Sequence, residues 1–93
     1  MRIVLAPLAA QDLQEAYDFI ASDNPEAADS VLAGILEAFG MIASGHVQGR
    51  QVSLRSGDRV RTWAHPPYRI YYRIVRDELQ VVRVYHQARR PME

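Results

Sequence analysis

The 93-residue chain contains no cysteine. This absence excludes a disulfide framework, a thiolate zinc site, an iron–sulfur cluster and a cysteine nucleophile. The rest of the composition is ordinary, because 48% of the residues are hydrophobic and 24% are charged, as in an average globular domain. Such a short chain predicts a single domain that covers residues 1–93.

Lysine is absent as well, so all eleven basic residues are arginines, whose planar forks suit carboxylates and phosphates. The charges are also segregated. Residues 1–48 hold one arginine and seven acidic residues, a net charge of −6. Residues 49–93 hold ten arginines and four acidic residues, a net charge of +6. We therefore expect the basic half to meet an acidic or anionic partner.

The sequence also lacks a long hydrophobic run. The apolar stretch that follows Met1 is interrupted at Pro7, and Gln11 and Asp12 come soon after. It is too short for the core of a signal peptide and far too short for a transmembrane helix. We interpret residues 1–6 as a β-strand, and we expect the protein in the cytoplasm and not at a membrane.

The acidic half predicts a helical hairpin. Asn24-Pro25 ends a first helix that begins near Pro7, and it also caps a second helix that stops at Gly45. Apolar residues recur every three or four positions, as in helices that cover a core. They are Leu13, Ala16, Tyr17 and Ile20, followed by Ala28, Val31, Leu32, Ile35, Phe39 and Ile42. The acidic residues expected to face solvent are Asp12, Glu15 and Asp18.

The basic half predicts a meander of three antiparallel strands, because three segments are rich in β-branched and aromatic residues and are separated by turn residues. The segments are Arg59–Ala64, Arg69–Arg76 and Leu79–His86. Only two residues separate the last two strands, which predicts a hairpin. Residues 46–58 are predicted as a loop. The expected fold is therefore a two-layer α+β domain with the element order β-α-α-β-β-β.

Alternate residues in the three strands differ in character. The even positions are apolar and are expected to pack against the helices: Val60, Ile70, Tyr72, Ile74, Val82 and Val84. The odd positions are basic and aromatic and are expected to form an open face: Arg59, Arg61, Trp63, Arg69, Tyr71, Arg73, Arg83 and Tyr85. An acidic or anionic partner would fit that face. The alternative is an ordinary solvated face whose arginines pair with nearby carboxylates.

Five segments occur in a recognisable order: Asp12-Leu13 with Tyr17–Ala21, Asp23–Ala28, Gly49-Arg50, Tyr68–Arg73, and Val82 and Val84 before His86 and Arg89. In order and spacing they resemble the ParE branch of the RelE/ParE superfamily of type II toxin–antitoxin systems. The resemblance implies the fold predicted above. It also implies a plasmid-stabilising toxin that inhibits growth by binding DNA gyrase and blocking replication.

The resemblance implies contact with the target through Arg69, His86, Arg89 and Arg90. The RelE branch instead cleaves messenger RNA on the ribosome, and here its catalytic positions correspond to Arg59, Arg61, Arg69, His86 and Arg89. Arginine keeps its proton and is a poor general base, and no tyrosine follows Tyr85. We therefore expect a protein that is not an enzyme, with a RelE-like endoribonuclease and a binding module without toxicity as the alternatives.

The resemblance also implies a ParD-like antitoxin whose C-terminal segment folds on binding and neutralises the toxin. The residues expected to bind it are Trp63, Tyr71, Arg73, Arg83 and Tyr85, and the alternative docking site is a groove beside the helical hairpin. DNA would be contacted only through the antitoxin or gyrase. The spacing of the three histidines matches no metal motif, so we expect no metal and no cofactor.

Overall fold

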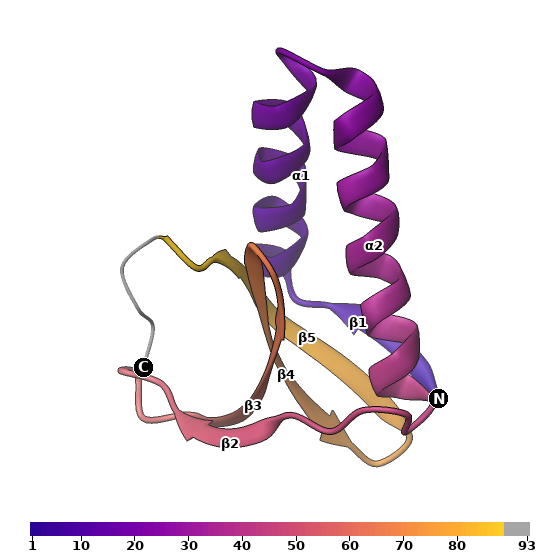
Figure 1. The fold of residues 1–93 in the computed structure, drawn as a ribbon. Coiled ribbons are helices and arrows are strands. Elements are labelled where there is room, and N and C mark those ends of the chain that lie inside the picture. Colours follow the sequence, from indigo (N-terminus) through magenta and orange to yellow (C-terminus); the bar gives the residue numbers. More distant parts are fainter. Residues whose placement is uncertain (89–93) are drawn as a thin grey trace.

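The computed structural model describes residues 1–88, which form a helical hairpin on one face of a single sheet (Figure 1). The elements are β1 (Arg2–Leu5), α1 (Pro7–Ala21), α2 (Pro25–Ala43), β2 (Arg50–Ser53), β3 (Arg59–His65), β4 (Tyr68–Val75) and β5 (Glu78–His86). The predicted two-layer α+β fold class is confirmed. Within these residues, neither helix combines the length and the apolar character needed to cross a membrane.

The sheet has the strand order β1-β5-β4-β3-β2. β3, β4 and β5 form the predicted antiparallel meander. β1 extends the sheet at one edge because it pairs in parallel with β5, with Leu5 beside Val81. β2 extends the other edge and pairs antiparallel with β3. The prediction of three strands in the sheet is therefore wrong, since the described residues form five.

β2 lies inside the segment predicted as a loop, residues 46–58. It has four residues, of which only Val52 is apolar, and so short a pattern carries little strand signal. Gly49 brings the chain close to β3 just before β2 begins. Its backbone N–H donates to the Tyr72 hydroxyl at 2.7 Å, and a Cβ there would lie 2.3 Å from the Thr62 carbonyl oxygen. Only glycine fits this close approach.

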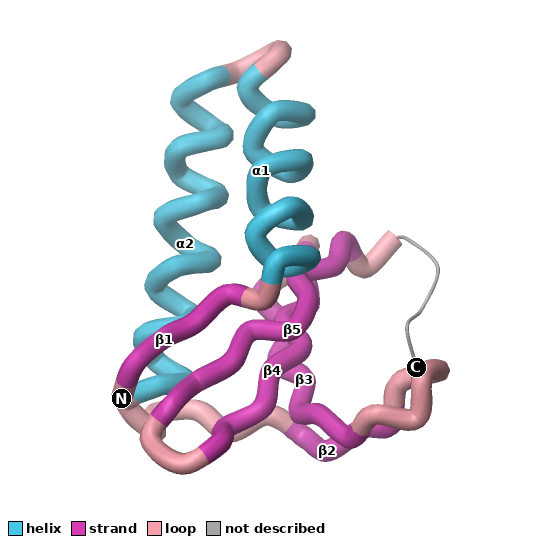
Figure 2. Tube along the Cα trace, turned by 180° about the vertical axis from the view of Figure 1, so that it is seen from behind, coloured by secondary structure: helices cyan, strands magenta, loops and turns pink. Residues whose placement is uncertain are grey.

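The helices begin and end where the sequence predicts. A proline occupies the start of each, and the Asn24 side chain accepts a hydrogen bond from the Ala27 backbone N–H at 3.1 Å, which caps α2. Beyond α2, Gly45 has a φ of 81°, a left-handed conformation that favours glycine. The tip of the hairpin extends well beyond the sheet in two opposite views (Figures 1 and 2).

The main core lies between the helices and the sheet. Its buried residues come from α1, α2, β4 and β5: Ala9, Leu13, Ile35, Ala38, Phe39, Ile42, Tyr68, Ile70, Tyr72, Leu79, Val81 and Val84. A second, smaller cluster consists of Leu54, Val60 and Tyr71, against which Val52, Val82 and Tyr85 pack. We call the sheet face that carries this second cluster, turned away from the helices, the open face.

The two faces of β3 are the reverse of the prediction. Trp63 pairs with Ile70 and packs against the main core, whereas Val60 belongs to the second cluster. Directly paired residues of antiparallel strands share a face, and here an odd residue of β3 pairs with an even residue of β4. Odd and even numbers therefore do not mark the same face on both strands. The predictions that Arg61 and Trp63 lie on the open face and that Val60 faces the helices are wrong.

A bulge in β5 produces a second reversal. Tyr71 of β4 lies opposite Arg83, but the next residue, Tyr72, lies opposite Val81. Val82 is the extra residue, and it packs against the second cluster instead of the main core. The bulge thus moves β5 out of the alternation that the sequence predicts, and the placement of Val82 among the helix-facing residues is wrong.

Candidate interaction surfaces

A buried carboxylate joins α1 to the edge of β5. The pairing of β1 with β5 ends at Val81, whose carbonyl accepts from the Ala6 backbone N–H at 2.9 Å. Beyond this point, within the described part of the chain, the edge of β5 hydrogen-bonds to the Asp12 side chain of α1 and not to a neighbouring strand. The Asp12 carboxylate accepts from the Val84 backbone N–H at 3.0 Å and from the Nε and Nη2 atoms of Arg83 at 2.7 and 2.9 Å.

The Asp12–Arg83 pair changes two sequence predictions. Asp12 was expected to face solvent, but only 8% of its surface is exposed, so that prediction is wrong. Arg83 was expected to offer its charge to the antitoxin, yet the guanidinium is bound to Asp12 on two atoms. The hydrogen bond to Asp12 raises the pKa of Arg83, and partial burial opposes this effect. The guanidinium also lies 5.3 Å from the centre of the Tyr85 ring.

A groove of about 480 Å³ runs beside α1, where the sequence placed the alternative docking site. α1 forms one wall, and the start of β4 with the end of β5 forms the other. The lining residues are Asp12, Glu15, Ala16, Phe19, Tyr68, Val84, His86 and Ala88. Phe19 is 82% exposed, an unusual state for so large an apolar side chain, so the groove offers apolar surface to a partner.

His86 lies in this groove and is fixed by two contacts. Its ring meets the Tyr68 ring edge-on, with the centroids 5.3 Å apart. Its Nδ1 accepts a hydrogen bond from the Ala88 backbone N–H at 3.0 Å. A neutral ring that accepts at Nδ1 carries its proton on Nε2, so His86 can donate a hydrogen bond from Nε2.

The open face holds two of the predicted arginines beside neutral partners. The Nη1 of Arg69 donates to the Thr62 hydroxyl at 3.3 Å, and the Nε of Arg73 donates to the Gln80 side-chain carbonyl at 2.9 Å. Neither bond neutralises the cation. Tyr71 is almost completely buried and Tyr85 is partly buried, and both rings belong to the second cluster on the same face as Arg69 and Arg73.

Comparison with known proteins identifies the family. A family model described as the ParE toxin of type II toxin–antitoxin system, parDE, matches residues 3–91. The chain belongs to the ParE toxin family. A solved structure from the chromosomal ParDE TA system of P. aeruginosa is similar with a TM-score of 0.75 and 24% sequence identity, over 92% of this chain and 95% of that one. This likeness shows a shared fold. No curated protein sequence matches the chain.

Within residues 1–88, the ParE fold places three of the residues expected for a RelE-like ribonuclease, Arg61, Arg69 and His86, on different sides or at different positions of the sheet. Arg61 pairs with Tyr72 and therefore lies on the helix-facing side of the sheet. Arg69 pairs with Tyr85 and lies on the open face. Along the sheet the two arginines are three pairs apart, about 10 Å. Arg59 lies still farther from Arg69, and His86 faces the groove beside α1.

The four residues predicted to contact the target do not form one site among the described residues. Arg89 and Arg90, expected to touch the target, fall outside residues 1–88. Arg69 and His86, the other two target residues, occupy adjacent pairs at one end of the β4–β5 ladder but face opposite sides of the sheet. Within the described part of the chain, no group of three or more histidine and acidic side chains could hold a metal ion.

Sequence reasoning missed the role of Asp12 in the ParE fold. The helical periodicity alone assigns Asp12 to the polar side of α1, although it directly precedes the buried Leu13. The missing information is the end of β1, which leaves the Val84 backbone N–H without a strand partner. No spacing in the sequence records a contact over 72 positions.

Proposed function

We propose that this ParE-family chain is a toxin that acts by binding DNA gyrase and blocking replication, not by cleaving RNA, and that a ParD-like antitoxin neutralises it. Membership of the family supports the toxin assignment. The observation that favours binding over catalysis is the division of Arg61, Arg69 and His86 between the two sides of the sheet. General acid–base cleavage of RNA needs such groups within hydrogen-bond reach of one phosphodiester.

Gyrase inhibition is tested with two parallel assays on the purified chain. One measures gyrase supercoiling together with trapped cleaved DNA, and the other measures messenger cleavage on programmed ribosomes. We expect inhibition of gyrase and no codon-positioned cuts. Arg89→Ala should raise the inhibitory concentration about tenfold or more if this arginine anchors the target.

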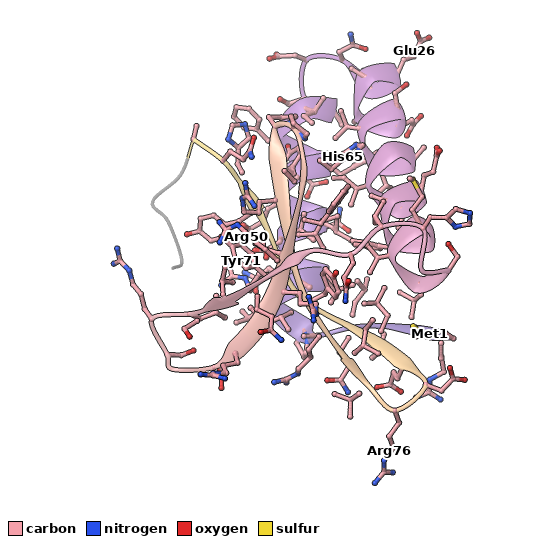
Figure 3. All side chains as sticks on the ribbon, turned by 60° about the horizontal axis from the view of Figure 1, so that its bottom comes forward. Met1, Glu26, Arg50, His65, Tyr71 and Arg76 are labelled. Carbon is pink, nitrogen blue, oxygen red and sulfur yellow. The ribbon has the colours of Figure 1, made fainter. Side chains whose placement is uncertain are left out.

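Arg76→Ala is the matched control for that experiment. Arg76 is exposed at the β4–β5 turn and points away from the rest of the molecule (Figure 3). Its loss removes the same charge and should leave gyrase inhibition unchanged. Messenger cleavage by the unmodified chain would refute the proposal. Inactivity in both assays would indicate a binding module without toxicity.

The open face is the proposed antitoxin site. Arg73 is exposed there, and among residues 1–88 its side chain is bound to the neutral Gln80 side chain, so its charge is available to a carboxylate. The partly buried Tyr85 ring supplies apolar surface beside it. An acidic, amphipathic segment that folds on binding would cover both features. Arg83 contributes differently, because its charge is already held by Asp12.

Charge reversal tests this site. Arg73→Glu should weaken the antitoxin complex about tenfold or more, because a carboxylate would face the acidic segment. Arg76→Glu, which makes the same charge change three residues away, should have little effect. Calorimetric titration of each variant with the antitoxin measures the difference. Equal affinities for Arg73→Glu and the unmodified chain would remove the open face from the interface and favour the groove beside α1.

A further inference from the structure

The sheet splits between β3 and β4. β3 pairs with β4 only over Arg61–His65, and its first two residues pair only with β2. On the other side of the split, residues 73–75 of β4 pair only with β5. The β2–β3 end of the sheet and the β4–β5 turn therefore diverge, as two opposite views show (Figures 1 and 2).

A notch of about 180 Å³ lies at this split. It is lined by Gln51, Arg59, Val60, Arg61, Arg73 and Ile74, and we call it the basic notch. A second hollow of about 250 Å³ adjoins it and shares Gln51 and Arg59. Three arginines from two strands thus line one small space.

Within the described part of the chain, no carboxylate neutralises the charges of the basic notch. None of the described residues that line it is acidic. Arg61 donates to the Gly49 backbone carbonyl at 2.7 Å and Arg73 to the Gln80 side-chain carbonyl at 2.9 Å, and both acceptors are neutral. The Glu78 carboxylate accepts from the Gln80 side chain at 2.9 Å and forms an ion pair with Arg2 at 3.0 Å, and it does not line the notch.

These contacts also orient two of the arginines. Each uses one nitrogen for a protein acceptor, and a guanidinium has five N–H donors, so most of them stay available. Among residues 1–88, the pairing of β3 with β4 does not extend past Arg61 and Tyr72 into the split. The notch therefore combines a concave surface with oriented cationic donors.

We propose that the basic notch binds a phosphate group. Guanidinium forks match phosphate oxygens in geometry and charge, and a tetrahedral phosphate presents oxygens to β3 and β4 at once. A single carboxylate has its two oxygens in one plane on one side of the carbon, whereas the oxygens of a phosphate group are placed tetrahedrally around phosphorus. The proposal concerns direct binding by this chain and does not depend on gyrase being the target.

The phosphate can belong to a nucleic-acid backbone or to a small phosphorylated molecule, and the probes separate these sources. The full-length chain, labelled with ¹⁵N, is titrated with inorganic pyrophosphate and separately with a short single-stranded oligonucleotide, at constant ionic strength. The side-chain Nε–H signals of the arginines report binding. We expect saturable shifts of the Arg59 and Arg73 signals with at least one probe.

Arg59→Gln and Arg73→Gln test the residues, with Arg76→Gln as the control that removes the same charge outside the notch. Each notch variant should weaken binding about tenfold or more, because a hydrogen bond to a charged group contributes about 1.5–3 kcal/mol. Arg76→Gln should bind as the unmodified chain does. Both mutated notch residues are exposed, so the amide spectrum should confirm an intact fold.

Each outcome of the titrations decides one question. Saturation by pyrophosphate alone supports a small phosphorylated ligand, and tighter binding of the oligonucleotide supports a nucleic-acid backbone. Equal affinity in all variants, or shifts that stay linear in both probes, would overturn the proposal. Saturation by a glutamate-rich peptide but by neither phosphate probe would overturn it too, because the notch would then be a carboxylate site.

Discussion

Removal of the Asp12 carboxylate is the most direct test of how the helical hairpin is attached to the sheet. In Asp12→Ala, the Arg83 guanidinium and the Val84 backbone N–H lose the acceptor that they share. Both groups lie at the edge of β5 where β1 has ended. Among residues 1–88 no other strand pairs with β5 at this position, so we expect a loss of stability without a change of fold.

The expected loss of unfolding free energy is about 3 kcal/mol. Breaking a buried ion pair by removing one partner costs about 3–5 kcal/mol, but the Arg83 side chain is 24% exposed and can turn toward water, which lowers the cost. The Val84 N–H adds about 1–3 kcal/mol when it is left unsatisfied. Alanine is the better helix former by roughly 0.5 kcal/mol, which offsets a small part.

Urea denaturation followed by circular dichroism measures this loss. Asp18→Ala is the matched control, because Asp18 lies on the same helix, is exposed and, among residues 1–88, its carboxylate accepts from the Gln14 side chain alone. The control should change the free energy of unfolding by less than about 0.5 kcal/mol. A result for Asp12→Ala equal to that of the control would refute the role assigned to this carboxylate.

A double-mutant cycle separates the ion pair from the other effects. In Asp12→Ala combined with Arg83→Met, no unpaired charge remains, and the methionine keeps part of the arginine's apolar stem. We expect the double variant to be about 2 kcal/mol more stable than the sum of the two single changes predicts. Strict additivity would show that Asp12 and Arg83 do not stabilise each other.

Two further predictions concern the helical hairpin and the start of β2. The hydrogen bond to Asp29 raises the pKa of Tyr17 above its ordinary value of 10.0. Because the unfolded chain then loses this proton first, the free energy of unfolding should fall as pH rises above 10. Tyr17→Phe should make that fall smaller in urea midpoints measured across this pH range. Gly49→Ala should lower the free energy of unfolding by about 2 kcal/mol in the same assay, because its Cβ would meet the Thr62 carbonyl oxygen. Gly40→Ala in α2 is the control: its Cβ would have open space, so it should stabilise the protein by about 0.5–1 kcal/mol.

Much of the fold could be predicted from local sequence signals. Asn24-Pro25 carries the capping chemistry that separates the helices, and the two-residue turn before Glu78 fixes the β4–β5 hairpin. β1 was also predicted as a strand, but its parallel partner could not be inferred. A parallel pair is joined through distant residues, so no turn in the sequence specifies its register.

The candidate surfaces were predicted less well, because they depend on the register in which neighbouring strands pair. The alternation of residues within one strand is local, but the face that two strands share depends on their pairing, which the sequence does not display. Trp63 and Val60 were exchanged between faces for this reason. The bulge that displaces Val82 adds one residue that no turn or proline announces.

The acidic half of the sequence forms the helical hairpin, and most of the basic half forms strands of the sheet. The Asp12–Arg83 pair joins the acidic half to the basic half, but Arg61 and Arg73 are bound to neutral carbonyls. Among residues 1–88 these two charges have no carboxylate partner, so they can meet one on another molecule. On the α1 side, Glu15 lines the groove and accepts only from the neutral Gln11 side chain among residues 1–88.

A partner that covered both the open face and the groove beside α1 would need acidic residues in one part and neutral or basic residues in the other. An acidic segment is attracted to Arg73 on the open face, but the same segment would meet the Glu15 carboxylate in the groove beside α1. Like charges in contact are unfavourable, so the part of a partner that enters the groove should be apolar, to cover Phe19, and neutral or basic next to Glu15. A uniformly acidic segment fits only the open face, and this difference separates the two docking sites by the sequence of the partner that each accepts.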